Sequence, residues 1–173
     1  MTSRFDIVKQ LDNSVIDFTQ EYNDVVLWNA IALSNKHDYS KEAIQRQYAL
    51  VTEEHNELHE AIDSSDLVET IDALCDIFVV AGYWMFLNKL KPNLEGFVVD
   101  SVNAVEGVYY QFTTFEKKEL QVASLFQDTL NALASIKGGK EYLQEVLRSN
   151  MSKFAQKGFF EDKGILPEVV AAN

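Results

Sequence analysis

Acidic side chains recur at helical spacing on a face that also carries apolar residues. A rotation of about 100° per residue places Glu54 and Glu57 in one arc of roughly 100° together with three apolar side chains. Those three are Leu50, Leu58 and Ala61. Because a helix packs its apolar face against its neighbours, we expect the two carboxylates to face inward.

The segment that follows repeats this pattern. Glu69, Asp72 and Asp76 fall within an arc of roughly 60°. The same stripe continues into Val79, Val80, Tyr83 and Leu87. Burying several ionised carboxylates together raises their pKa values or destabilises the fold unless cations compensate them. Mg²⁺ is the expected cation, because Mg²⁺ prefers oxygen ligands and bridges carboxylates to substrate phosphates. Mn²⁺ is an alternative.

Two other interpretations start from the same acids. Acidic residues on helices more often form a solvated face, so the stripes could line a wet surface of a structural bundle. A di-iron bundle would take Glu-x-x-His from its helices, but Thr52 and Asn56 stand three residues before His55 and His59. Both histidines point away from the acidic stripe, and we expect them to face solvent.

Long helices must position these acids. The chain has only two prolines and seven glycines, and its apolar residues recur at three- and four-residue spacing. This spacing predicts an almost entirely helical chain. The expected helices span about 5–22, 25–35, 41–63, 66–90, 98–113, 116–136 and 140–154.

Local signals define the acidic helices further. Ser40 is the expected N-cap of the helix at 41–63, and a polar break at 63–66 should let that helix and the next pack as an antiparallel hairpin. Asp66 and Glu69 form a variant of the capping box, in which the Glu69 side chain reaches back to the N–H of Asp66.

Composition narrows the class of protein. The 173 residues suit one domain, and 47% hydrophobic with 24% charged residues is a globular mixture. A net charge of −12 argues against nucleic acid as a partner. The single cysteine, Cys75, excludes an internal disulfide, and we expect it to be a small packing residue. With no signal pattern and a longest apolar run at Ile77–Leu87, below the ~20 residues of a membrane span, we expect a cytoplasmic protein without a membrane partner.

At the acidic helices the sequence resembles the all-α nucleoside triphosphate pyrophosphohydrolases: MazG, dimeric dUTPase, dCTP pyrophosphatase and the phosphoribosyl-ATP pyrophosphohydrolase-like proteins. Their signature is Glu-x-x-Glu on one helix and Glu-x-x-Asp on the next. Residues 46–58 resemble the first metal helix and 72–82 the second, while 145–153 resemble the segment that closes the phage-type members. The position three before Asp76, usually Glu in the family, is Ala73 here.

The resemblance implies a fold and a reaction. The fold is an antiparallel helical bundle of the MazG-like type, a single all-α domain over residues 1–173 with a helical insertion at about 95–140. The reaction is Mg²⁺-dependent cleavage of a nucleoside triphosphate, with deoxynucleotides expected, to monophosphate and pyrophosphate. The family usually completes its bundle with a second chain, which implies a homodimer unless the insertion covers the same face within one chain.

The resemblance also implies roles for residues. Glu54, Glu57 and Asp76 should hold the metal, with one of the two glutamates serving as general base. Asp72, with Glu69 in a lesser role, should replace the ligand lost at Ala73. The expected contacts to the nucleotide come from Arg46, Asn150 and Lys153. Trp28, Tyr22 and Phe18 could stack on a base, although aromatic residues at helical spacing are usually core.

Two functions other than catalysis remain open. Because Ala73 removes a usual ligand, the chain could be a nucleotide- or metal-binding regulatory module. It could also be a purely structural bundle. Release of pyrophosphate would separate the enzyme from both.

Overall fold

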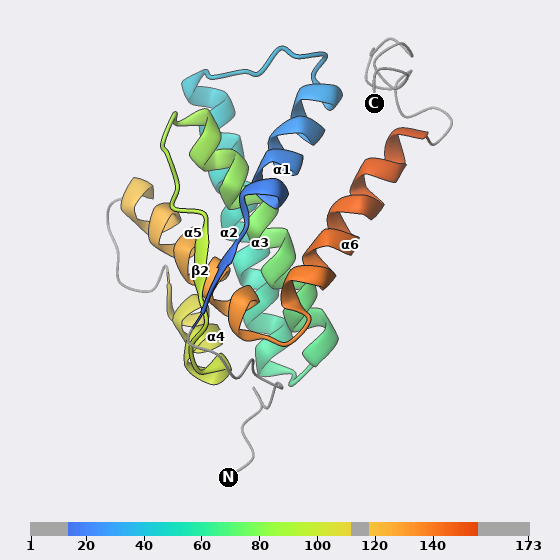
Figure 1. Cartoon of the computed structure of the whole chain (residues 1–173). Coiled ribbons are helices and arrows are strands. Elements are labelled where there is room, and N and C mark those ends of the chain that lie inside the picture. Colours follow the sequence, from blue (N-terminus) through green and yellow to red (C-terminus); the bar gives the residue numbers. More distant parts are fainter. Residues whose placement is uncertain (1–13, 112–117, 156–173) are drawn as a thin grey trace.

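The computed structural model describes residues 14–111 and 118–155, which form an almost entirely helical molecule (Figure 1). The helices in these ranges are α1 (Thr19–Ala32), α2 (Lys41–Asp63), α3 (Leu67–Leu87), α4 (Ser101–Tyr110), α5 (Lys118–Ser135) and α6 (Gly139–Ser152), followed by the short 3-10 helix η1 (Lys153–Ala155). Two three-residue strands, β1 (Val15–Asp17) and β2 (Glu95–Phe97), pair antiparallel. The fold is therefore all-α, as the sequence predicted.

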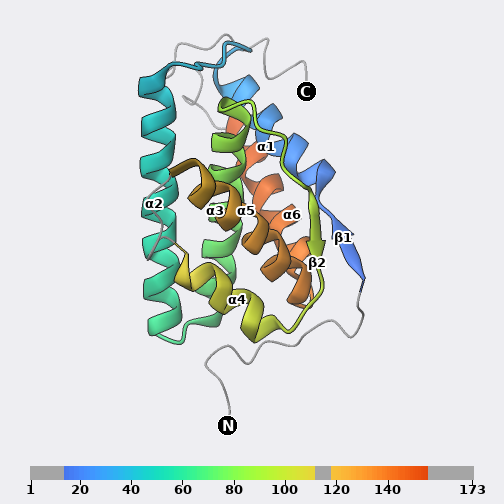
Figure 2. The same ribbon diagram turned by 90° about the vertical axis from the view of Figure 1, so that its left-hand side faces the viewer.

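Helices α2 and α3 lie antiparallel, side by side (Figures 1 and 2). The hydroxyl of Ser40 accepts the N–H of Ala43 at 3.1 Å and caps α2, as predicted. The carboxylate of Asp66 accepts the N–H of Glu69 at 3.1 Å and caps α3. Ser65 has a φ of 55° in the turn between them, which reverses the chain within three residues. The predicted hairpin is therefore present.

Helix α3 is the centre of the core. It contacts α2 along its length, α5 on one side, and α1 and α6 on the other (Figure 2). Among the described helices it is the one with the length and apolar composition of a membrane span, yet 67% of its most apolar window is buried inside the protein. These are the features of a core helix.

The predicted insertion packs onto the hairpin. The ring of Phe126 on α5 lies 5.3 Å from that of Phe78 on α3, and Phe126 also approaches Gly82 closely enough that a β-carbon there would be 3.2 Å away. Strand β2 crosses α5 at Gly96, where a β-carbon would lie 2.5 Å from the carbonyl oxygen of Leu130. Only glycine permits this approach.

The start of the chain differs from its prediction. The helix expected at 5–22 falls partly on residues 1–13, outside the described range. Residues 15–17 of it form β1 instead, and α1 begins at Thr19, whose N–H and hydroxyl donate to the Asp17 carboxylate at 3.0 and 2.6 Å. From there α1 runs to Ala32 without the break expected near residue 23. The pairing with β2 sets this boundary, and residues some 80 positions away supply it.

The two histidines of α2 do not face solvent as predicted. His55 is buried and donates through Nε2 to the carbonyl of Val108 at 2.8 Å, while His59 donates to the carbonyl of Tyr109 and stacks on its ring. These carbonyls belong to the last turn of α4, where a helix leaves acceptors without partners of its own. The insertion therefore covers the histidine side of α2.

Candidate active site

Carboxylates from the two helices of the hairpin converge at one place. Glu54, Glu57 and Asp76 each offer an oxygen, and these atoms lie within 4.8 Å of one another. Glu54 and Asp76 are half-buried, whereas Glu57 is exposed. The Oε2 atom of Glu54 is buried without a hydrogen-bond partner among the described residues. The predicted convergence of these three acids is therefore present in the structure.

The face that carries these acids is more open than the stripe suggested. Leu58 and Ala61 are buried, as expected, but Leu50 is 42% exposed. The reason is that α4 and α5 pack on the histidine side of α2, and in the described part of the chain they leave the Leu50 side accessible. The site is therefore a surface-accessible cluster at the edge of the core.

Burial and neighbouring charges raise the pKa values of two acids of the cluster, Glu54 and Asp76. Burial raises the pKa of Glu54 to about 8, and the charge of Asp76 and contacts with Glu57 add to the effect. Burial raises the pKa of Asp76 to about 6, helped by the charges of Asp72 and Glu57 and opposed by Lys153. A divalent cation would offset this repulsion and provide a partner for Glu54 Oε2. The donor set therefore fits a hard, oxygen-preferring metal.

Asp72 and Glu69 lie one and two turns before Asp76 on α3, outside the group of three. Asp72 is half-buried, and its charge affects Asp76 more than that of the exposed Glu69 does. The capping box predicted for Glu69 forms only in part, because the N–H of Asp66 donates to the carbonyl of Ala61 at 2.9 Å. Ala73, at the family's usual ligand position, is buried in the core.

A pocket of about 170 Å³ lies beside this cluster, between α1, α3 and α6. Its lining residues are Asp24, Val25, Trp28, Asn29, Val79, Leu147, Asn150 and Lys153. Val79 follows Asp76 by one turn of α3, which joins the pocket to the acids. Trp28 donates to the carbonyl oxygen of Asn150 at 2.9 Å, and Lys153 donates to its side-chain oxygen at 3.2 Å. The structure thus places Asn150 and Lys153 side by side on the wall of this pocket.

Arg46 lies apart from this pocket. Its guanidinium is exposed and forms an ion pair with Asp38 at 3.8 Å. It lines a separate groove of about 570 Å³ between α1, α2 and α3, in which Leu50 and Tyr83 also lie. Asn29 lines both the groove and the pocket. Arg46 and the pair Asn150 and Lys153 therefore line two adjoining cavities, with Asn29 between them.

Two residues of the site were not identified from the sequence. Asn29 occupies an ordinary helical position, and its side-chain N–H donates to the carbonyl of Val25 at 2.9 Å, so no spacing signal marks it. Tyr142 on α6 has its pKa raised by burial and then by the charge of Asp72, so its hydroxyl lies in the field of the acids. In the sequence, only the position of Tyr142 just before the 145–153 segment indicated a place near the site.

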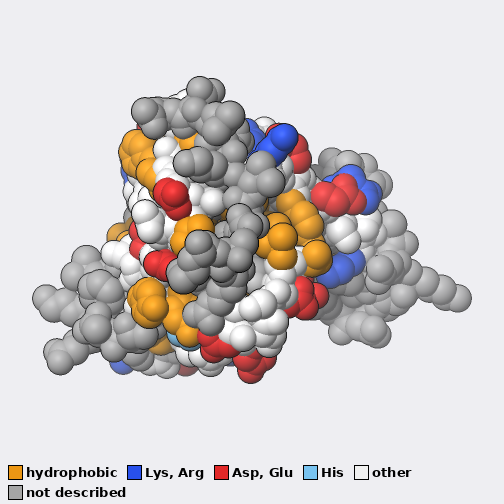
Figure 3. All heavy atoms as spheres, turned by 90° about the horizontal axis from the view of Figure 1, so that it is seen from below, with side chains coloured by type: hydrophobic (Ala, Val, Ile, Leu, Met, Phe, Trp, Pro, Cys, Tyr) orange, Lys and Arg blue, Asp and Glu red, His pale blue; other side chains and the backbone are white. Residues whose placement is uncertain are grey.

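Acidic side chains also spread over the end of the molecule that holds the α2–α3 turn. Figure 3 shows them in several patches there, with exposed hydrophobic side chains between them.

The carboxylate cluster has little positive charge near it. Among the basic residues in the described ranges, Lys153 is the one whose charge lowers the pKa of Asp76. An anionic ligand at this site would therefore depend on a cation in addition to Lys153.

Comparison with known proteins identifies the hairpin. Residues 26–93 match the family model of phosphoribosyl-ATP pyrophosphohydrolase. The match covers α2, α3 and the second half of α1, and so includes the five acids, but ends before the insertion and α6. No curated protein and no solved structure matches significantly. Residues 26–93 therefore match the family that the acidic helices resemble, a family of pyrophosphohydrolases of the MazG-like superfamily.

Proposed function

We propose that this protein is a Mg²⁺-dependent nucleoside triphosphate pyrophosphohydrolase that prefers deoxynucleotides and releases monophosphate and pyrophosphate. The observation that carries the proposal is the convergence of Glu54, Glu57 and Asp76 within 4.8 Å on a hairpin that matches the phosphoribosyl-ATP pyrophosphohydrolase family. Mn²⁺ is expected to substitute for Mg²⁺, since both accept carboxylate oxygens.

The residues divide the chemistry between them. Glu54, Glu57 and Asp76, supported by Asp72, hold Mg²⁺, which offsets the charge of the polyphosphate and of the transition state. One of the two glutamates takes a proton from the attacking water. The water oxygen bonds to the α-phosphorus as the bond to the α–β bridging oxygen breaks, and pyrophosphate leaves with that electron pair.

The nucleotide is held from α1 and α6. The pocket beside Val79 takes the nucleoside part of the substrate, with Asn150 and Trp28 on its walls. Lys153 approaches the phosphates, since its charge already acts on Asp76. Arg46 reaches a phosphate only by leaving its ion pair with Asp38. We therefore assign Arg46 a smaller role in binding the phosphates than Lys153.

The proposal extends to the domain organisation, the oligomeric state and the location of the protein. We take residues 1–173 as one domain that acts as a cytoplasmic homodimer, without nucleic-acid or membrane partners. The net charge of −12 supports the exclusion of nucleic acid. Removal of altered or surplus nucleotides from the cellular pool suits this activity.

A binding module without turnover is the second candidate function. Ala73 favours it, because the position is buried in the core and offers no carboxylate to the metal. Such a module would bind nucleotide and metal through the same cluster and pocket. It would release no pyrophosphate.

The test is a product assay on the purified full-length protein. Each ribo- and deoxynucleoside triphosphate is incubated with Mg²⁺ or Mn²⁺, and monophosphate, pyrophosphate and orthophosphate are measured separately. We expect pyrophosphate from at least one nucleotide, its loss with chelator and in Asp76→Asn, and its retention in the exposed neighbour variant Glu53→Gln. Direct release of orthophosphate, or no turnover, overturns the proposal. Binding without turnover establishes the second candidate.

A further inference from the structure

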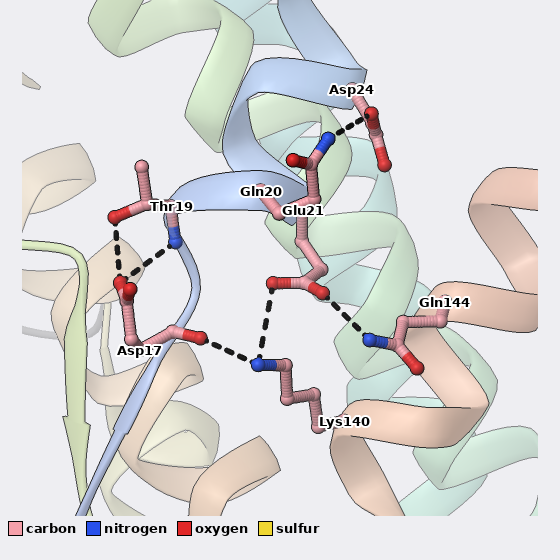
Figure 4. A network of polar contacts seen from close by, with 7 residues as sticks. All are labelled: Asp17, Thr19, Gln20, Glu21, Asp24, Lys140 and Gln144. Atoms are coloured by element: carbon pink, nitrogen blue, oxygen red, sulfur yellow. Dashed lines mark hydrogen bonds and ion pairs between the residues drawn. The ribbon is translucent and has the colours of Figure 1, made fainter.

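Glu21 is a buried acid that the proposed chemistry does not use. It lies in the first turn of α1 and is only 1% exposed. Its Oε2 atom accepts a hydrogen bond from Gln144 Nε2 at 2.9 Å, and its Oε1 atom lies 3.9 Å from Lys140 Nζ (Figure 4). Both partners belong to α6. The start of α1 is therefore tied to the first half of α6 by contacts between a buried acid and two partly exposed partners.

Lys140 extends this contact to the chain before α1. Its Nζ atom donates to the carbonyl oxygen of Asp17 at 2.8 Å (Figure 4). The carboxylate of Asp17 in turn accepts from Thr19 at the start of α1. One lysine of α6 therefore meets both the end of β1 and the buried acid of α1.

Charged contacts made by a buried acid define the position of a helix more narrowly than apolar packing does. Apolar side chains can slide past one another at little cost, whereas Glu21 buried away from Lys140 and Gln144 would be an uncompensated charge. The contact therefore favours a single register of α6 along α1. Such a role is the best-attested use of buried polar groups.

The pocket that we propose for the nucleotide lies along the same contact between α1 and α6. Two turns after Glu21, Trp28 donates to the carbonyl oxygen of Asn150 at 2.9 Å, and its ring centroid lies 5.3 Å from that of Phe154. Trp28 and Asn150 both line the pocket. A shift of α6 along α1 would move Asn150 and Lys153 away from Trp28 and from the acids.

We infer that Glu21 is a positioning residue for the nucleotide pocket. Through Lys140 and Gln144 it fixes the register of α6, which places Asn150 and Lys153 for the substrate. The inference rests on the proposed function in taking this pocket as the nucleotide site. The proposed metal ligands come from α2 and α3 and make no part of this contact.

Two substitutions separate the parts of the contact. Glu21→Gln keeps an oxygen that can accept from Gln144 but removes the charge that faces Lys140, and Glu21→Ala removes both. We expect KM for the nucleotide to rise by roughly tenfold in Glu21→Ala and by less in Glu21→Gln, with a smaller change in kcat. Glu145→Gln, the same change at an exposed position of α6, should leave KM unaltered.

A second readout needs no turnover. In a Trp84→Phe background, Trp28 is the remaining tryptophan, and its emission reports its contacts with Asn150 and Phe154. We expect Glu21→Ala to shift this emission to longer wavelength and Glu145→Gln to leave it unchanged. The rise in Tm produced by Mg²⁺ should be equal in wild type and both Glu21 variants.

The outcomes distinguish this inference from the proposed function. An unchanged KM and unchanged emission in Glu21→Ala overturn the positioning role and leave the enzyme proposal intact. A fall in kcat at constant KM also overturns it. If the wild type turns over no nucleotide, the proposed function fails, and the emission of Trp28 still decides whether Glu21 positions α6.

Discussion

Glu54 and Asp76 face each other from α2 and α3, with an oxygen of each within 4.8 Å of the other. The charge of Asp76 adds to burial in raising the pKa of Glu54 to about 8. Without a cation, Glu54 therefore holds a proton at neutral pH. Cation binding at this pair is consequently coupled to proton release.

Glu54→Gln should stabilise the metal-free protein. The folded-state pKa of about 8 lies above the ordinary value of 4.5, so the acid contributes its full stability below pH 4.5 and loses it as pH rises toward 8. Glutamine does not titrate, and we expect a gain of about 1 kcal/mol at pH 7.5, after allowance for solvent screening of this half-buried group. Urea unfolding in chelator measures it, with Glu53→Gln as control. In Mg²⁺ the variant should lose the metal-dependent rise in Tm, and an equal rise in both proteins would exclude Glu54 as a ligand.

Asp72 should replace the ligand lost at Ala73. Its charge affects Asp76 more strongly than that of Glu69, and it is the less exposed of the two. We expect Asp72→Asn to weaken Mg²⁺ binding by about tenfold and Glu69→Gln to change it little. Calorimetric titration and turnover assays, with Tm measured alongside, compare the two. Near-normal activity in Asp72→Asn with loss in a stable Glu69→Gln would reverse the assignment.

His55 should make the fold acid-sensitive. Burial lowers its pKa to about 4 from the ordinary value of 6.5. Its contribution to stability is therefore present above pH 6.5 and is lost as pH falls toward 4, because the unfolded chain then binds the extra proton. His55→Gln keeps a donor for the Val108 carbonyl without titrating, and should reduce this loss by about 2 kcal/mol. Denaturant unfolding from pH 7 to 4 measures both proteins, and parallel pH profiles would contradict the assignment.

A homodimer is expected in solution. Leu33 and Leu50 are each at least 40% exposed, and both line the groove between α1, α2 and α3. Light scattering at micromolar concentration should give about twice the chain mass of 19.7 kDa, and Leu50→Glu should weaken the association. A wild-type mass near that of one chain would show that the insertion completes the bundle by itself.

The acidic hairpin could be predicted because its determinants are local. Helical rotation decides that Glu54 and Glu57 share a face, and Ser40 and Asp66 mark the helix starts from their own side chains. The three-residue strand β1 carries too little pattern to reveal itself. Its pairing depends on β2, far along the chain.

The rest of the site depends on contacts between distant segments. Nothing in the α2 sequence shows that the carbonyls of α4 will meet His55, and no motif links Glu21 to Lys140. The family match also ends at residue 93, so the pocket wall from α6 lies outside it. Periodicity assigns a residue to a face but does not identify the element that covers it.

The bond between Trp28 and Asn150 joins residues 122 positions apart in the chain. Closing so long a loop costs entropy that is recovered only once α6 has docked, whereas the α2–α3 hairpin closes through neighbours in sequence. Helix α6 therefore joins late in folding and is among the first elements to detach when the native state opens locally. We then expect the acids to be assembled before the pocket beside them, and a ligand that spans both would hold α6 against the α2–α3 hairpin.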